Sequence, residues 1–209
     1  RDQNQDAVGA FEAELGRLFV VCDGMGGHTG GQIASALAAA TLGEAFAAAP
    51  EGTEPTTLLR EGLVAANRRI RERAYADGAD LMGTTCTAML VDARGDSFWI
   101  GHVGDTRAYR LRGGEFSQLT RDHTVVEAMI ARGEIGREQA ETHPKAGVLE
   151  RSLGVEPSVV PDVAGPLPLY DQDVYVLCSD GLTKMMAESD IQRMATELPP
   201  EAACAAMIK

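Results

Sequence analysis

Segments with helical spacing and segments with strand-like spacing form separate blocks along this chain. Apolar residues recur at helical spacing over residues 32–49 and 56–76, which predicts two helices. Further along, β-branched and aromatic runs occupy 83–92, 96–105 and 106–120 and are bounded by glycine turns. Because helices and strands do not alternate, an α+β fold with layered packing is favoured over a doubly wound sheet.

The remaining segments extend this block pattern. The three runs after the helices predict an antiparallel meander. Residues 124–148 are irregular and partly helical, with charged residues mixed among apolar ones. Strand character returns at 158–165 and 173–181, and helical spacing covers 187–208. A chain of 209 residues is long enough for one domain with a substantial core, and we expect residues 1–209 to form one.

A cluster of glycines follows one of the most apolar runs. In "LFVVCDGMGGHTGG", residues 18–31, five of the eight residues after Asp23 are glycine. Such density usually serves a close approach of the backbone to another group, since ordering glycine is costly. A dinucleotide-binding loop does not fit, because its third glycine would fall on Thr29. A phosphate-binding P-loop does not fit either, because the stretch contains no lysine.

Three apolar strand-like runs each end in an aspartate. These are Asp23 in "FVVCDG", Asp105 in "FWIGHVGDT" and Asp180 in "VYVLCSDG", and Asp6 lies near the start in "RDQNQD". Each Asp taken singly is explained well by a turn, in which Asp and Gly are common. Carboxylates packed together repel unless a cation lies among them, and such oxygen ligands select Mg²⁺ or Mn²⁺. Both interpretations stay open for these residues alone.

Composition excludes several classes of function. The formal net charge of −12 would repel nucleic acid, and no cluster of basic residues offsets it. No apolar run is long enough to span a membrane, so we expect no membrane association. None of the four cysteines forms a C-x-x-C pair, which disfavours a zinc site and suits a reducing cytoplasm.

Seven short motifs occur in the order found in one enzyme family. They are "RDQNQD", "VVCDGMGGH", "GTT", "GHVGDTRAYRL", "LTRDHT", "HPKAGVLERSLG" and "LCSDGLT", and they span residues 1 to about 185. In this set the chain resembles the bacterial PPM family (type 2C) of metal-dependent serine/threonine protein phosphatases. The resemblance implies a four-layer α-β-β-α sandwich with two antiparallel sheets. It also implies hydrolysis of phosphoserine and phosphothreonine by attack of a metal-bridging hydroxide.

The resemblance further implies a centre of two Mn²⁺ or Mg²⁺ ions. Asp23 would bridge the two metals, and the Gly24 carbonyl would bind one of them. Asp180 would serve the first metal and Asp6 the second, directly or through water. Asp105 resembles the residue that, with Asp180, holds a third and weaker metal in bacterial members.

Two further residues are implied to act on the substrate. Arg1 matches the arginine that clamps the substrate phosphate, where a planar fork can give two hydrogen bonds. His28 is a candidate to protonate the leaving oxygen, or else it only orients a strand or a water. The expected catalytic residues are therefore Arg1, Asp23 and His28. We expect His123 and His143 to be structural or flap residues, and His102 to be packed in a strand.

Residues 124–148 match the family's flap subdomain beside the active site. Within them, Arg132, Glu134 and Arg137 either contact a protein substrate or form a solvated charged face. Two departures from the family pattern are visible. Gln5 stands where many members have Glu, and the "G-x-D-N" motif that supplies a further metal ligand is missing. The strand that the family has before Arg1 is missing too, and the chain stops abruptly at Lys209, so we expect the sequence to be cropped at both ends.

The expected partners are phosphorylated proteins, made by a cognate serine/threonine kinase, and we expect a cytoplasmic signalling enzyme that is a monomer. One alternative is a catalytically impaired pseudophosphatase that binds phosphoproteins or regulates a partner. Retention of the metal carboxylates argues against it. Another is a phosphohydrolase that acts on small molecules at the same centre, which the sequence does not separate from protein dephosphorylation.

Overall fold

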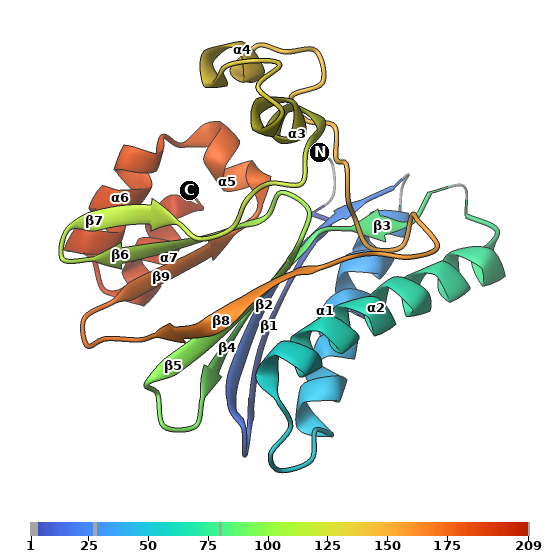
Figure 1. The fold of residues 1–209 in the computed structure, drawn as a ribbon, viewed down its shortest axis with the longest axis horizontal. Coiled ribbons are helices and arrows are strands. Elements are labelled where there is room, and N and C mark those ends of the chain that lie inside the picture. The colour runs from blue at the N-terminus through green and yellow to red at the C-terminus, as the bar shows by residue number, and fades with distance from the viewer. Residues whose placement is uncertain (1–3, 27–28, 80, 209) are drawn as a thin grey trace.

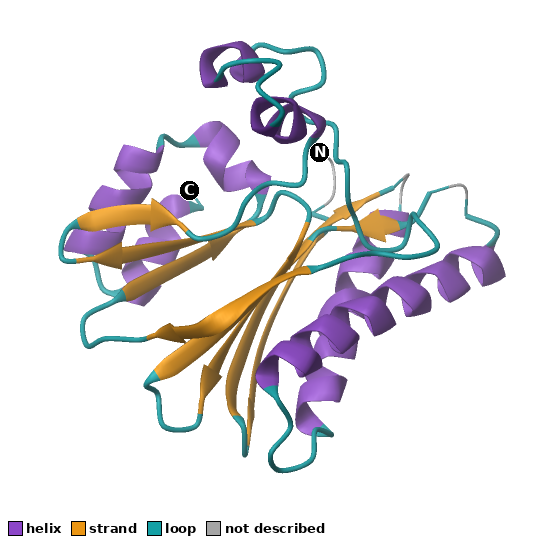
Figure 2. Cartoon of the chain, viewed as in Figure 1, coloured by secondary structure: helices purple, strands orange, loops and turns teal. Residues whose placement is uncertain are grey.

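The computed structural model describes residues 4–26, 29–79 and 81–208. Two antiparallel sheets lie face to face, with helices on their outer sides (Figures 1 and 2). This arrangement confirms the predicted α+β sandwich. Within the described part of the chain, no helix is long and apolar enough to cross a membrane.

The larger sheet has the order β1-β2-β4-β5-β8, with the short β3 paired to the end of β2. Its strands are β1 (Asp6–Ala13), β2 (Gly16–Met25), β3 (Gly83–Thr84), β4 (Cys86–Asp92), β5 (Ser97–Val103) and β8 (Asp162–Pro168). Strand β2 alternates between buried and more exposed positions until Val21, and then stays buried through Cys22, Asp23 and Gly24. The aspartate end of this strand is therefore enclosed by other parts of the chain.

The smaller sheet has the order β7-β6-β9. Its strands are β6 (Arg107–Arg112), β7 (Glu115–Gln118) and β9 (Val174–Cys178). The predicted meander over 83–120 is therefore wrong in one respect, because β6 does not pair with β5. At Gly104 the backbone takes a φ of +108°, and the chain leaves the larger sheet for the smaller one. A left-handed φ of this kind is readily adopted by glycine.

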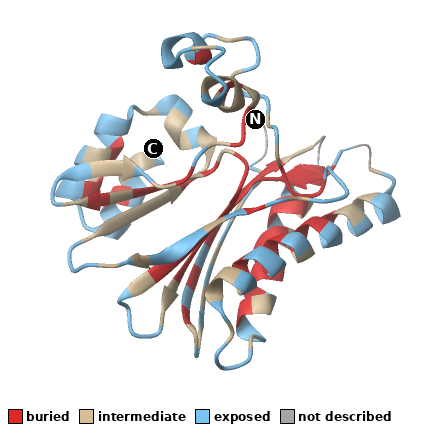
Figure 3. Cartoon of the chain, in the orientation of Figure 1, coloured by how far each residue is buried: buried red, intermediate tan, exposed pale blue. Residues whose placement is uncertain are grey.

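Helices α1 (Gly30–Ala47) and α2 (Pro55–Asp77) cover the outer face of the larger sheet, which confirms the two predicted helices. The main core lies between them and the sheet, and Figure 3 shows it as the buried band along these elements. A second cluster fills the space between the sheets, where Phe98 and Tyr175 meet edge to face with ring centroids 4.9 Å apart. Both faces of the larger sheet are thus packed.

The other helices lie around the smaller sheet and at one end of the sandwich. They are α3 (Val125–Ala131), α4 (Arg137–Glu141), α5 (Asp180–Met185), α6 (Glu188–Glu197) and α7 (Pro200–Met207). The helical pattern predicted over 187–208 is present as two helices, since Pro199 and Pro200 interrupt it. Helices α3 and α4 stand apart from both sheets in Figure 1.

The packing of α2 gives a direct stability prediction. Leu63 is fully buried against the larger sheet, whereas its neighbour Val64 is 45% exposed. Replacing Leu63 by Ala removes apolar contacts and leaves a cavity, which should lower the free energy of unfolding by about 2–5 kcal/mol. Val64→Ala should change it by only about 0.5 kcal/mol. Urea unfolding of both variants measures this, and equal effects would contradict the packing described.

Candidate metal centre

Asp6 and Asp23 lie directly opposite each other on neighbouring strands. The antiparallel register of β1 and β2 pairs these two residues. Asp6 is exposed at the start of β1, and Asp23 is only 8% exposed near the end of β2. The register therefore brings together two carboxylates that are distant in sequence.

The backbone of Asp23 is held by two threonines that follow α2. Its N–H donates to Thr85 Oγ1 at 3.0 Å. Its carbonyl oxygen accepts from the Thr85 N–H at 2.9 Å and from Thr84 Oγ1 at 2.9 Å. All of these groups are buried, so the bonds lie away from competing water. The "GTT" segment thus fixes the point from which the Asp23 side chain projects.

Gly24 lies where two stretches of backbone cross. Its N–H donates to the Gln5 carbonyl at 3.1 Å. A Cβ at this position would lie 2.1 Å from the Gly31 carbonyl oxygen and 2.6 Å from the Gln5 carbonyl oxygen. No side chain fits in that space. The glycine cluster therefore lets the end of β2 pass against the start of α1, which explains the close approach expected from the sequence.

Gln5 has a structural part in this crossing. Its carbonyl accepts from Ser35 Oγ at 2.6 Å as well as from the Gly24 N–H. Its side-chain amide donates to the Gly26 carbonyl at 3.3 Å. These bonds give residue 5 a role that does not depend on ligation of a metal.

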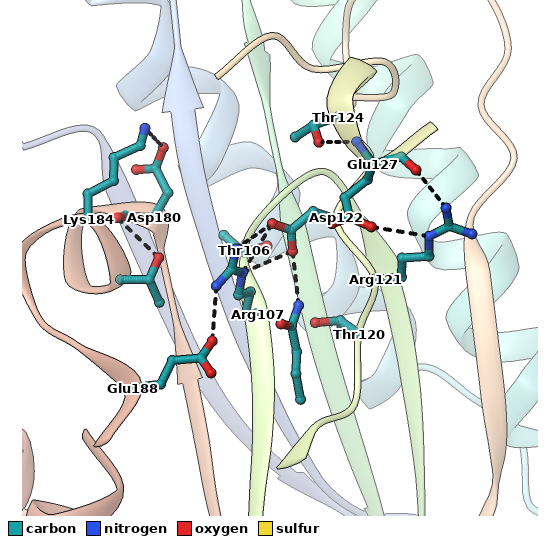
Figure 4. Close-up of polar contacts among 12 residues, drawn as sticks. Thr106, Arg107, Thr120, Arg121, Asp122, Thr124, Glu127, Asp180, Lys184 and Glu188 are labelled. Carbon is teal, nitrogen blue, oxygen red and sulfur yellow. Dashed lines mark hydrogen bonds and ion pairs between the residues drawn. The ribbon is translucent and has the colours of Figure 1, made fainter. Parts of the chain in front are cut away.

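Asp180 is the first residue of α5 and is separated from the end of β9 by Ser179 alone. The residue before it, Ser179, donates from Oγ to Asp6 Oδ2 at 2.9 Å. That bond joins the aspartate-bearing end of the smaller sheet to that of the larger sheet. The Asp180 carboxylate forms an ion pair with Lys184, one turn further along α5, as Figure 4 shows.

Asp105 occupies the turn between β5 and β6 and is half-buried. Burial raises the pKa of its carboxyl to about 6, and the negative charges of Asp180 and Asp122 add to the effect. The nearby Lys184 acts in the opposite direction. The raised pKa marks Asp105 and Asp180 as neighbours whose charges repel at neutral pH.

The structure brings together Asp6, Asp23, Gly24, Asp105 and Asp180 at one end of the two sheets, whereas Arg1 and His28 lie outside the described residues. Over the described ranges, no group of three or more His, Cys, Asp or Glu side chains is already placed to hold a metal ion. The contacts between the carboxylates are pairwise.

The chemistry of the donors nevertheless fits a hard divalent cation. The gathered groups are carboxylate and backbone carbonyl oxygens, which suit Mg²⁺ or Mn²⁺. Two carboxylates already have cationic or hydroxyl partners, with Lys184 at Asp180 and Ser179 at Asp6. A cation bound at Asp180 would therefore compete with the Lys184 ammonium group.

A cavity of about 910 Å³ opens beside Asp105 and Asp180. Its far wall is formed by α3 and α4, within the segment 124–148, and by Arg121. Glu127 on α3 accepts from Arg137 of α4 at 3.1 Å and lies 3.7 Å from Arg121. Arg132 and Glu134 form an ion pair with each other. The pairs Glu127–Arg137 and Arg132–Glu134 therefore both lie within the segment.

Sequence reasoning missed the network around Arg107. Its guanidinium donates to both oxygens of Asp122, with the shortest bond at 2.7 Å, and also reaches Glu188 (Figure 4). It also donates to the Tyr109 hydroxyl at 3.0 Å. The "GDTR" and "TRDHT" motifs supply Arg107 and Asp122, so adjacency to these motifs is the only signal that the sequence carried.

The histidines are placed largely as expected. His102 is buried in β5, where Nδ1 lies 2.9 Å from Thr87 Oγ1 and Nε2 lies 3.1 Å from the Arg121 carbonyl. Burial lowers the pKa of this imidazole to about 3, so it is neutral. His123 is also buried and contacts Gly104 and Asp162. His143 lies in the irregular segment, where Nδ1 accepts from the Lys145 N–H.

The raised pKa of Asp105 predicts that ionisation of this carboxyl lowers the free energy of unfolding of the metal-free protein. Ionising this carboxyl is harder in the folded state than in the unfolded chain, so the cost grows above pH 3.8 and is complete above about pH 6. Asp105→Asn should raise the free energy of unfolding at pH 7.5 by on the order of 2–3 kcal/mol and have little effect near pH 4. Urea unfolding in EDTA at both pH values tests this.

Asp171→Asn, at an exposed position in the loop before β9, is the control for removal of a negative charge. If Asp105→Asn gained as much stability at pH 4 as at pH 7.5, the result would contradict the burial of the Asp105 carboxylate and its repulsion by neighbouring charges.

Comparison with known proteins identifies the relationship. The profile of the protein phosphatase 2C family matches residues 2–203. The serine/threonine phosphatase stp of Listeria welshimeri is 37% identical over 198 residues, which cover 92% of this chain and 77% of that protein.

Solved structures agree with this match. The serine/threonine phosphatase of S. agalactiae superposes with a TM-score of 0.91 at 34% identity, covering 100% of this chain and 86% of that one. The catalytic domain of the serine/threonine protein phosphatase PstP, in complex with two manganese ions, gives a TM-score of 0.82 at 32% identity, covering 100% and 84%. The chain therefore belongs to the protein phosphatase 2C family.

Proposed function

We propose that this chain removes phosphate from phosphoserine and phosphothreonine residues of proteins at the centre formed by Asp6, Asp23, Gly24, Asp105 and Asp180. The observation that carries the proposal is the bond from Ser179 to Asp6, because it joins the aspartate-bearing ends of the two sheets. As a member of its family the chain is a metal-dependent serine/threonine phosphatase, and the pseudophosphatase alternative is not favoured.

In this proposal one set of residues binds metal ions and another set binds the substrate. Asp23 would bridge two cations, with the Gly24 carbonyl and Asp180 on one and Asp6 on the other. Asp105 and Asp180 would hold a third ion. Two divalent cations so placed lower the pKa of a shared water and neutralise charge on phosphoryl oxygens. The bonds from Thr84 and Thr85 to Asp23 keep the bridging carboxylate in position before any substrate binds.

The substrate phosphate would be bound by Arg1, whose guanidinium can give two parallel hydrogen bonds to phosphoryl oxygens. His28 would give a proton to the departing serine or threonine oxygen or orient a water beside it. The large cavity beside Asp105 and Asp180 offers space for a peptide, and its wall from 124–148 would act as the flap.

The proposal also covers the source of the substrates, the metal ions, the cellular compartment and the oligomeric state. The substrates would come from a cognate serine/threonine kinase, and the bound ions would be Mn²⁺ or Mg²⁺. We place the protein in the cytoplasm as a monomer. The four cysteines are free, as a reducing compartment would keep them.

Asp23→Asn tests the bridging role. The variant keeps the shape of the side chain but loses its charge, so turnover should fall by about a hundredfold or more while the fold survives. The assay is hydrolysis of a phosphothreonine peptide in Mn²⁺, with circular dichroism as the check on folding. Glu12→Gln, at an exposed position on β1, controls for removal of an acidic group. Wild-type turnover in Asp23→Asn would sink the mechanism.

Arg1→Ala tests the clamp. Loss of a charge-assisted pair should raise KM for the phosphopeptide by about tenfold and leave kcat less affected. Steady-state kinetics at saturating Mn²⁺ separates the two constants. Arg17→Ala, an exposed arginine in the β1–β2 hairpin, is the matched control. An unchanged KM in Arg1→Ala would refute the assignment.

A further inference from the structure

Among the described residues, His123 is a hydrogen-bond partner of both the N–H and the carbonyl group of Gly104, in the turn before Asp105. The His123 N–H donates to the Gly104 carbonyl at 2.7 Å. The Gly104 N–H donates to Nδ1 of the His123 ring at 3.1 Å. Because Nδ1 accepts a hydrogen bond from a backbone amide, it carries no proton of its own. The imidazole is therefore the neutral tautomer protonated at Nε2.

The other ring nitrogen is held by a carboxylate. Nε2 donates to Asp162 Oδ2 at 3.1 Å, and Asp162 Oδ1 accepts from Arg151 at 2.7 Å. Arg151 in turn donates to the Val160 carbonyl at 3.0 Å. The His123 side chain is 1% exposed, so it cannot turn away to water. Gly104 on one side and the stretch 151–162 on the other thus fix both the tautomer and the orientation of this imidazole.

Gly104 also packs closely against Thr85, the residue that binds the backbone of Asp23. A Cβ on Gly104 would lie 2.5 Å from both Cβ and Cγ2 of Thr85. Thr85 is the residue whose hydroxyl and N–H bind the backbone of Asp23. The turn that carries Asp105 and the strand end that carries Asp23 therefore share one contact point.

The residue after Asp105 is anchored as well. The Thr87 hydroxyl lies 2.8 Å from Thr106 Oγ1 and 3.0 Å from the Thr106 carbonyl oxygen. Both flanks of Asp105 are thus fixed by buried bonds, and at Gly104 the direct bonding partner is an ionisable side chain. Loss of the His123 ring would leave the Gly104 N–H buried and unpaired.

We propose that His123, oriented by Asp162 and Arg151, is a positioning residue that sets the Gly104 turn and so holds the Asp105 carboxylate beside Asp180 for metal binding and turnover. The inference rests on the proposed function, because it assigns a purpose to the position of Asp105. In this role His123 does not touch the substrate or the metal. The histidine acts through the backbone of Gly104.

The test uses His123→Ala and His123→Asn. An asparagine Oδ1 occupies nearly the place of Nδ1 and can accept the Gly104 N–H, whereas alanine cannot. In His123→Ala we expect kcat for a phosphothreonine peptide to fall about tenfold or more with KM within roughly twofold, and His123→Asn to recover most of the loss. Tyr75→Ala, which removes an exposed aromatic ring on α2, should retain wild-type constants.

Two readouts do not depend on turnover. The Gly104 amide signal in ¹H–¹⁵N spectra of the metal-free protein should shift in His123→Ala and return toward the wild-type position in His123→Asn. Calorimetric titration with Mn²⁺ should show about tenfold weaker binding at the weakest site in His123→Ala. Wild-type kcat, amide shift and Mn²⁺ affinity in a folded His123→Ala would overturn the inference.

Asp162→Ala keeps the test decisive if His123→Ala does not fold. The Asp162 side chain is 54% exposed, so its removal leaves the core intact, yet it frees the ring to change tautomer. A folded Asp162→Ala with lowered kcat and a shifted Gly104 amide supports the positioning role, and wild-type values refute it. Absence of Mn²⁺-dependent turnover in the wild-type chain would instead end the proposed function itself.

Discussion

Repulsion among carboxylates at one end of the sandwich is the constraint on which the rest of the structure depends. Asp6 faces Asp23 across two strands, and the pKa of Asp105 rises because of its burial and its proximity to Asp180. Like charges at this density destabilise the fold without a cation. A divalent ion that binds among them relieves the repulsion, which favours its binding. The fold must therefore supply rigid backbone anchors that hold these groups together.

Those anchors come from the polar backbone and hydroxyl groups that surround the site. Threonines 84 and 85 bind the backbone of Asp23, Ser179 joins Asp6 to the start of α5, and Gly24 allows the end of β2 to cross the start of α1. Each bond is modest alone, but the buried bonds from the two threonines fix direction as well as distance. The proposed metal ligands are thus placed by contacts to their backbone, as at Asp23, and to their side chains, as at Asp6.

The helices and the positions of the aspartates could be predicted from the sequence, whereas the contacts that join distant parts of the chain could not. The two long helices follow from apolar spacing, and the aspartates stand out at the ends of apolar runs because local patterns encode both. The bond from Ser179 to Asp6 spans 173 residues, and the one from Asp23 to Thr85 spans 62, so no local pattern encodes either. The place of β6 in the second sheet depends on its pairing with β9, about 70 residues away, so no local pattern encodes it either.

The central claim is that these carboxylates form a divalent-metal centre that hydrolyses phosphoproteins. The most direct measurement is the initial rate of phosphate release from a phosphothreonine peptide in Mn²⁺, after addition of excess EDTA, and after Mn²⁺ is restored. The account predicts turnover in Mn²⁺, its loss in EDTA and its recovery with Mn²⁺. Turnover that persists in EDTA, or no turnover although calorimetry shows bound Mn²⁺, would contradict it.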